Sequence, residues 1–327
     1  MTKSLRARPI TGTIGLVCLM LLVMASSSTA QTSKQRALVL SGGGPVGEAW
    51  ESGVLVGLKE SGVDLSDADL ILGTSAGAVV GGRLASRMPQ KDFIDAALAP
   101  ADAPPPGAPP APKPSGPPPD LSFLGAKLDA MTSDDAHNQP LRAAIGRWAM
   151  QAHPVVDEAG FVASYQRRFP AQWPSRAFEC VSIDAGDGSI KVWKESSNEP
   201  TALAVAASCA LPGVFAPVAI NGHRYMDGGV RSVSNADLAS GCRTALVLAP
   251  TMGLNDPLAK SFTRALPMEL AKLRAGGCQV ELIAPDAASI KAFGPSVGNE
   301  RGRSPAFDAG RVEGQNLARE IGELWRR

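Results

Sequence analysis

The stretch DLILGTSAGAVVGG, residues 69–82, combines a strand pattern, a sharp turn and a helix pattern. Asp69–Leu72 predicts a short strand, and the alanine, valine and glycine residues after Gly77 predict a helix. Between them, Gly73-Thr74-Ser75-Ala76-Gly77 fits the G-x-S-x-G pattern, whose glycines permit a turn that exposes the serine hydroxyl. Ser75 is therefore a candidate nucleophile at a helix N-terminus, where the helix dipole would stabilise an oxyanion. Many such pentapeptides are ordinary strand–helix turns.

The alternation of strand and helix continues on both sides of this stretch. We expect a strand at Arg36–Leu40, a helix from about Val46 to Glu60, and strand hairpins at Phe178–Ile183/Ser189–Lys194 and Val218–Ile220/His223–Met226. Two apolar runs, Cys242–Pro250 and Cys278–Pro285, flank an expected helix at Pro267–Ala275, which is the layout of parallel strands joined by a crossover helix. The pattern predicts an α/β fold with a mostly parallel central sheet and helices on both faces.

The first 30 residues have the features of a secretory signal peptide. Three basic residues precede a short apolar run at 14–25, and small residues precede Gln31. The run is short for a membrane span, which needs about 20 residues. We expect export to the periplasm or the cell exterior, with one domain at 31–327. Whether segment 1–30 is cleaved or kept as an N-terminal anchor stays open.

The composition excludes several classes of protein. Without segment 1–30 the chain keeps 29 of its 32 basic residues and all 31 acidic residues, a net charge of −2. A nucleic-acid binder would show a clear cationic excess, so no nucleic-acid partner is expected. Four cysteines remain in that part of the chain, too few for a disulfide scaffold, and their spacing matches no zinc site. We therefore expect no metal.

A proline-rich segment at 100–119 breaks the pattern. Eleven of its 20 residues are proline, which fixes φ and lacks an N–H, so regular helix or sheet is excluded there. We expect an extended surface loop or linker, and the alternative is a flap beside an active site.

A serine nucleophile needs a base, and the three histidines suit that role poorly. His137 and His153 lie in a polar stretch and are expected at the surface. None follows His223, whereas an α/β-hydrolase places its histidine after the serine and the acid. Asp227 follows the second strand of an expected hairpin, in Asp227-Gly228-Gly229, and is the better candidate for a general base. Asp-Gly is also a common turn dipeptide.

The glycine-rich segment 41–47, SGGGPVG, follows the first expected strand. Gly42, Gly44 and Gly47 satisfy G-x-G-x-x-G, so a nucleotide-binding module is one interpretation. That fold places an acid at the end of its second strand to bind the ribose, whereas here the second strand leads into the Ser75 turn. Consecutive glycines also leave backbone N–H groups unobstructed, as an oxyanion hole requires.

These three motifs, in this order, resemble the patatin-like phospholipases. The resemblance spans about residues 36–250 and rests on the glycine loop, the Ser75 turn and Asp227-Gly228-Gly229. It implies a bacterial, exported lipid acyl hydrolase with a three-layer α/β/α fold and a Ser–Asp dyad. It departs from the family at Val46, where members often carry Arg or Lys. We expect activity to survive that change, because backbone N–H groups would bind the oxyanion.

The resemblance also assigns roles to individual residues. It implies Ser75 as nucleophile, Asp227 as base, Gly42, Gly43 and Gly44 as the oxyanion loop, Gly73 and Gly77 as the flanks of the nucleophile turn, and Gly228 and Gly229 as the rest of the Asp-Gly-Gly motif. The expected substrate is a lipid or acyl ester, which a membrane surface could present, and no cofactor is expected. The alternatives are a non-lipid esterase, a thioesterase, an acyltransferase, a nucleotide-binding module or a non-catalytic relative.

The cysteines suggest one further feature. Cys242 and Cys278 open the two expected parallel strands, so they would lie side by side at the same end of the sheet. In an oxidising compartment they could form a disulfide if those strands are neighbours, and two buried thiols are the alternative. Cys180 and Cys209 are expected in the core without a role.

Overall fold

The computed structural model describes residues 1–2, 35–100, 119–152, 154, 156–174 and 178–326. The chain divides into two units, Met1–Thr32 and Ser33–Arg327, and only the second is described in any length. The expected signal segment and nearly all of the proline-rich segment lie outside the described residues. Among the helices that are described, none has the length and apolar character to cross a membrane.

A single sheet of eight strands organises the described part of the second unit. Its strands are β1 (Arg36–Leu40), β2 (Leu70–Thr74), β3 (Phe178–Asp184), β4 (Ile190–Trp193), β5 (Val218–Ile220), β6 (His223–Asp227), β7 (Thr244–Leu248) and β8 (Gln279–Ile283). The order is β5-β6-β3-β2-β1-β7-β8, and β4 also pairs with β3. Strands β3, β2, β1, β7 and β8 are parallel, and the two hairpins add antiparallel pairs. This confirms the predicted α/β fold with a mostly parallel sheet.

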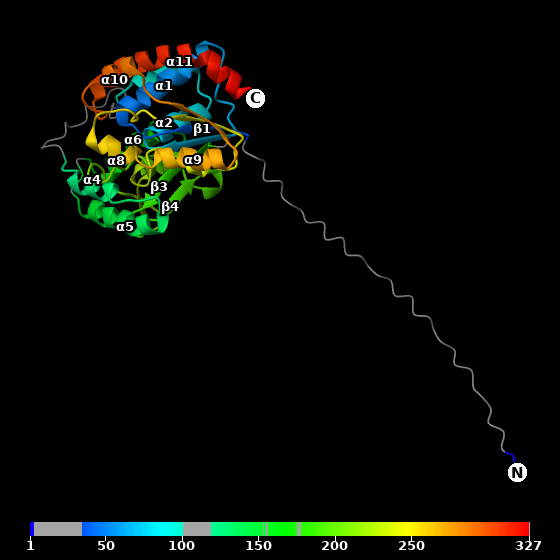
Figure 1. Ribbon diagram of the computed structural model, residues 1–327. Coiled ribbons are helices and arrows are strands. Elements are labelled where there is room, and N and C mark those ends of the chain that lie inside the picture. The colour runs from blue at the N-terminus through cyan, green and yellow to red at the C-terminus, as the bar shows by residue number, and fades with distance from the viewer. Residues whose placement is uncertain (3–34, 101–118, 153, 155, 175–177, 327) are drawn as a thin grey trace. The chain divides into compact units, whose positions relative to one another are not determined.

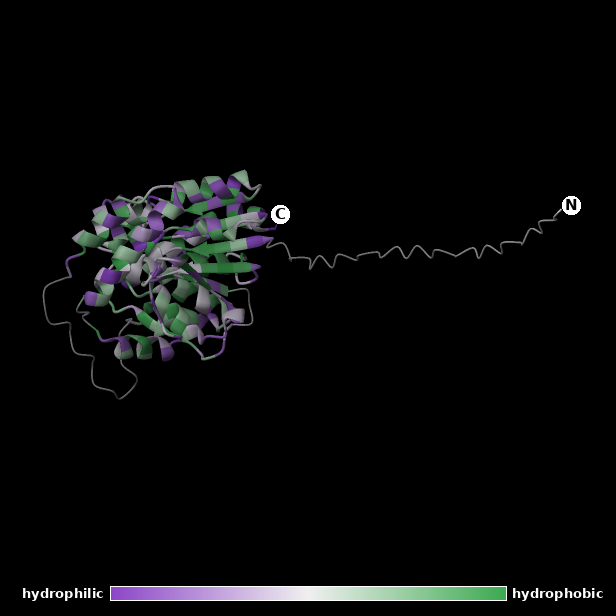
Figure 2. Ribbon diagram, turned by 90° about the horizontal axis from the view of Figure 1, so that it is seen from below, coloured by the Kyte–Doolittle hydropathy of each residue, from purple (hydrophilic) through white to green (hydrophobic). Residues whose placement is uncertain are grey.

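Helices cover both faces of the sheet (Figure 1). They are α1 (Gly44–Glu60), α2 (Ala76–Ala85), α3 (Gln90–Leu98), α4 (Ser122–Asp129), α5 (Asp135–Gln151), α6 (Glu158–Gln166), α7 (Thr201–Ser208), α8 (Pro257–Thr263), α9 (Leu266–Ala275), α10 (Ala287–Phe293) and α11 (Arg303–Trp325). Side chains of β1 alternate between the faces, as the strand period requires. Leu38 and Leu40 join the core beneath α1, α2 and α11, whereas Ala37 and Val39 join the core beneath α9. The strands form the apolar interior in Figure 2.

Most of the predicted elements are present, and their ends differ by a few residues. The first helix begins at Gly44 rather than about Val46, because Pro45 is well suited to a helix's first turn. Strand β2 runs from Leu70 to Thr74, so it leads directly into Ser75. The two apolar runs near the C-terminus form the neighbouring parallel strands β7 and β8, with α9 between them in sequence.

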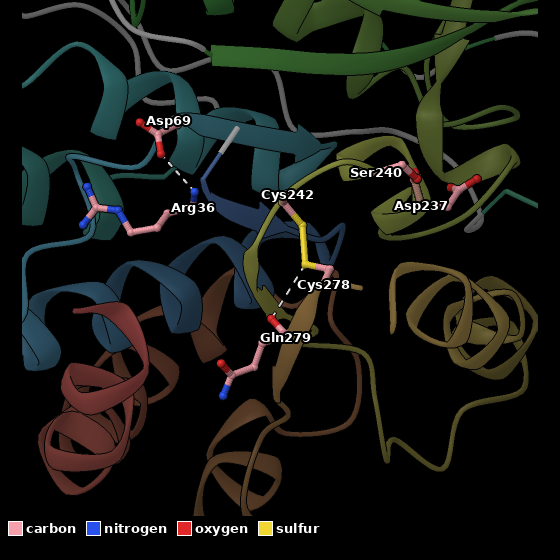
Figure 3. The surroundings of a disulfide bond; sticks show 7 residues. All are labelled: Arg36, Asp69, Asp237, Ser240, Cys242, Cys278 and Gln279. Atoms are coloured by element: carbon pink, nitrogen blue, oxygen red, sulfur yellow. Dashed lines mark hydrogen bonds between the residues drawn. A yellow bond between two sulfur atoms is a disulfide. The ribbon is translucent and has the colours of Figure 1, made fainter. Parts of the chain in front are cut away.

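Cys242 and Cys278 form a disulfide (Figure 3). Cys242 lies two residues before β7 and Cys278 directly before β8, and their Cα atoms are 5.6 Å apart. The bond therefore links the amino ends of two paired strands. Cys180 and Cys209 are buried free thiols, as expected of core residues.

Candidate active site

Strand β3 brings Ser75 and Asp227 together. On one edge of β3, Cys180, Val181 and Ser182 all pair with β4. On the other edge, Cys180 and Val181 pair with β2, and the next residue, Ser182, pairs with β6. Strand β6 therefore follows β2 along the same edge of β3. Val181 lies opposite Thr74 and Ser182 lies opposite Asp227. Two consecutive positions of β3 thus place the serine turn next to the aspartate.

Ser75 occupies a strained turn between β2 and α2. Its φ is 52°, in the left-handed region that non-glycine residues rarely adopt. The turn lies close against β1, because a Cβ at Gly77 would be 2.0 Å from the carbonyl oxygen of Leu40. Only glycine fits at position 77, so steric crowding explains why the predicted turn has a glycine there. Ser75 itself is only partly buried.

Ser208, at the end of α7, supports the serine turn and was not predicted. The Ser75 N–H donates to its Oγ at 3.0 Å, and its hydroxyl donates to the carbonyl oxygen of Val181 at 2.6 Å. The side chain is fully buried. A hydroxyl at the end of the apolar helix α7 was the signal in the sequence, and it does not say which segment the hydroxyl contacts.

The Asp227 carboxylate is buried beside the Ser75 turn. Only 4% of Asp227 is exposed. Burial raises the pKa of Asp227 to about 7, against the opposing effect of hydrogen bonds from the Gly229 N–H and the Ser75 hydroxyl. The Gly229 N–H lies 2.7 Å from Oδ1 and orients the carboxylate. Asp227 can therefore switch between acid and base near neutral pH.

The described histidines lie away from this pair. His223 begins β6, four residues before Asp227 and about 13 Å away along an extended strand. Its Nδ1 is 2.7 Å from Oδ2 of Asp184, and 63% of its side chain is exposed. His137 is exposed on α5, and His153 lies outside the described residues. Among the described residues no histidine reaches Ser75.

Cys209 is a further nucleophilic group, close enough for the charge of Asp227 to act on it. The charge of Asp227 acts on its thiol, which is buried one residue beyond α7. Burial, followed by that charge, raises the pKa of Cys209 to about 12. The thiol therefore stays protonated and leaves Ser75 as the better nucleophile.

The glycine loop after β1 lies beside Ser75, and one of its expected roles needs correction. A Cβ at Gly42 would lie 3.3 Å from the Ser75 Cβ, so the loop contacts the serine turn. The Gly42 N–H, however, donates to the carbonyl oxygen of Val233 at 2.8 Å and is not free to bind an oxyanion. Within the described residues, the N–H groups of Gly43 and Gly44 have no acceptor. These two amides are the available donors.

A buried carboxyl group holds the start of this loop. Oε1 of Glu51 accepts the Ser41 N–H at 2.8 Å, and the Glu51 side chain is fully buried. Burial raises its pKa well above the usual range, which favours the neutral form. Its position on α1 was not predicted as functional, because a glutamate in a helix is ordinarily exposed.

The structure offers little room for a nucleotide at the glycine loop. The Val46 N–H donates to the carbonyl oxygen of Val297 at 3.2 Å, and a Cβ at Gly44 would lie 2.9 Å from that same oxygen. A pyrophosphate would have to displace this segment from the start of α1. Val46 is fully buried and carries no charge.

Within the described residues, no group of histidine, cysteine, aspartate or glutamate side chains is arranged to bind a metal ion. The groups described at the site are a serine hydroxyl, a buried carboxylate with a raised pKa, and the two unpaired backbone amides of the glycine loop.

Solved structures and a family model are similar to this chain. VipD from Legionella pneumophila is similar in structure at 13% identity and a TM-score of 0.44, over 88% of this chain and 67% of VipD. The type III effector protein ExoU is similar at 15% identity and a TM-score of 0.39, over 88% of this chain and 53% of ExoU. No curated protein matches the sequence. A family model for patatin-like phospholipase matches residues 38–240, which is more than half of the chain. The chain therefore belongs to the patatin-like phospholipase family, a family of lipid ester hydrolases.

Proposed function

We propose that the protein hydrolyses lipid acyl esters with a catalytic dyad of Ser75 and Asp227. The placement of the buried Asp227 carboxylate beside the Ser75 turn, by two consecutive positions of β3, supports this most strongly. A serine hydroxyl is a weak nucleophile unless a base accepts its proton, and Asp227 is the carboxylate in contact with it.

The reaction would proceed through an acyl-enzyme. Ser75 Oγ attacks the ester carbonyl carbon while Asp227 accepts its proton, and the carbonyl oxygen becomes an oxyanion bound by the N–H groups of Gly43 and Gly44. Collapse of this intermediate breaks the ester C–O bond, and the leaving alcohol takes the proton from Asp227. Water then attacks the acyl-enzyme while Asp227 accepts its proton. As the bond between the acyl carbon and Ser75 Oγ breaks, Asp227 returns this proton to Oγ, which releases the fatty acid and restores the dyad.

The substrate class follows from the family, and the finer choices are proposals. A lipid at a membrane surface is the proposed substrate. A non-lipid esterase, a thioesterase and an acyltransferase would use the same dyad, because the pocket and the acceptor distinguish them rather than the nucleophile. We also propose that the protein is exported, on the strength of the features of segment 1–30 and the Cys242–Cys278 disulfide, since disulfides persist in oxidising compartments.

Labelling with a fluorophosphonate probe, followed by peptide mapping, tests the proposal. We expect one modified residue, Ser75. The rate of phospholipid-vesicle hydrolysis should fall in proportion to the fraction of Ser75 that is labelled. A folded protein that is labelled elsewhere, or that hydrolyses esters after complete modification of Ser75, would contradict it. Comparison of phospholipid, short-chain ester and acyl-thioester substrates would distinguish the alternatives.

A further inference from the structure

Asn235 lies at the centre of the hydrogen bonds beneath the proposed site. Its side chain is fully buried, and its φ of 51° is in the left-handed region, which asparagine adopts more readily than most residues. It ends the turn 232–235, which follows the Asp-Gly-Gly motif in the chain. A buried polar side chain in such a backbone conformation persists only where the surrounding contacts hold it.

The side-chain amide of Asn235 contacts the segments that carry both proposed catalytic residues. Its Nδ2 lies 3.1 Å from Oγ1 of Thr74, the residue directly before Ser75. The same Nδ2 lies 3.2 Å from the carbonyl oxygen of Gly228, the residue directly after Asp227. One NH₂ group therefore spans the serine turn and the aspartate loop.

The same amide also braces the turn that contacts the glycine loop. Its Nδ2 donates to the carbonyl oxygen of Ser232 at 2.7 Å. The next carbonyl in that turn, Val233, accepts the Gly42 N–H at 2.8 Å. The Asn235 side chain thus contacts the serine turn and the aspartate loop directly. It reaches the glycine loop through the turn at residues 232–235.

Arg231 determines which way the Asn235 amide faces. Nη1 of Arg231 lies 2.9 Å from Oδ1 of Asn235, and a guanidinium group can only donate. The amide oxygen must therefore face Arg231, which leaves the NH₂ group to face Thr74 and Gly228. Arg231 is itself held by Asp237, with nitrogen–oxygen distances of 2.9 and 2.8 Å.

We propose that Asn235 is a positioning residue of the active site. Its NH₂ group holds the serine turn and the aspartate loop at the separation that the Ser75–Asp227 hydrogen bond requires. The inference rests on the proposed function, because it concerns the reactivity of the same serine. A displacement of about 1 Å between reacting groups costs about 100-fold in rate, so loss of this contact should slow the reaction of Ser75 even in a folded protein.

The test is the second-order rate constant for labelling of Ser75 by a fluorophosphonate, measured with the thermal unfolding of each variant. Asn235→Asp keeps the size, the left-handed backbone and the acceptor for Arg231, but removes the donors. We expect a rate about 10–100-fold lower. Asn198→Asp is the matched control, because Asn198 has a φ of 55° and is exposed. Its rate should equal that of the wild type.

A second variant identifies the contact and serves if Asn235→Asp does not fold. Thr74→Val removes the acceptor and should slow labelling, whereas Thr74→Ser keeps it and should not. Asn235→Asp combined with Thr74→Val should be no slower than Asn235→Asp alone, because Thr74→Val breaks a contact that Asn235→Asp has already removed. Wild-type labelling rates in Asn235→Asp, or in Thr74→Val, or rate losses that multiply in the double variant, would overturn the inference. Absence of Ser75 labelling in the wild type would instead overturn the proposed function.

Discussion

The two ends of the parallel strands are held together in different ways. At the carboxyl ends of β1 and β2, the glycine loop, Ser75 and Asp227 are held by single hydrogen bonds, such as the one from Gly229 to Asp227 at 2.7 Å. At the amino ends of β7 and β8, one covalent bond joins Cys242 to Cys278. Loss of a contact at the first end should change the reaction, whereas loss of the bond at the second end should change only stability.

The largest expected effect is that of Ser75→Ala on activity. Removal of the nucleophile should lower phospholipid hydrolysis by about 10⁴-fold or more, since no other described side chain can form the acyl-enzyme. Steady-state hydrolysis of phospholipid vesicles measures it, and circular dichroism confirms the fold. Activity within tenfold of the wild type would place the reaction elsewhere.

Asp227→Asn should lower activity by about 10³-fold, because the amide cannot accept the serine proton.

The same change should raise stability at neutral pH, since it removes a buried carboxylate whose pKa is raised to about 7. That raised pKa means that the native carboxylate costs no stability below the ordinary value of 3.8, a growing amount as the pH rises from there to about 7, and a constant amount above it. The unfolding temperature of the variant should therefore exceed that of the wild type more at pH 8 than at pH 5. An equal difference at both pH values would contradict the burial of this charge.

At the other end of the sheet, the double change Cys242→Ser with Cys278→Ser should leave activity within twofold at 25 °C. It should lower the free energy of unfolding by about 3–4 kcal/mol, because the bond closes a loop of 36 residues in the unfolded chain. Denaturant unfolding measures the loss, and peptide mapping without reductant establishes that the wild-type bond is formed. A large loss of activity in the folded variant would break the distinction between the two ends.

The smallest expected effect is that of His223→Ala. His223 lies at the start of β6, away from Ser75. Its ring contacts Asp184, the last residue of β3, and 63% of its side chain is exposed. We expect less than a twofold change in hydrolysis rate, measured beside Asp227→Asn. Equal losses in the two variants would point to a histidine-dependent mechanism.

Sequence patterns predicted the elements and the three motifs because both are local. The strand at Arg36–Leu40 has the expected bounds, and the serine turn and the aspartate motif each end a strand. What joins them depends on contacts between distant residues. No local pattern indicates that Ser182 lies opposite Asp227 or that Ser208 binds the Ser75 N–H.

The glycine loop shows the same limit in a single residue. A run of glycines predicts unobstructed N–H groups, but it cannot show that the Gly42 N–H is already bound to Val233, which lies far along the chain. Likewise, Asn235 sits in a polar turn that looks ordinary in the sequence. Its importance comes from burial and from acceptors contributed by β2 and by the aspartate loop.

The dependence of Ser75 phosphonylation on pH tests the dyad most directly. If Asp227 is the base, the rate constant should rise with pH through an apparent pKa near 7 and then level off, because the ionised carboxylate is the active form. The rise should persist in His223→Ala and vanish in Asp227→Asn. A rise near pH 7 that survives in Asp227→Asn would show that another group activates the serine.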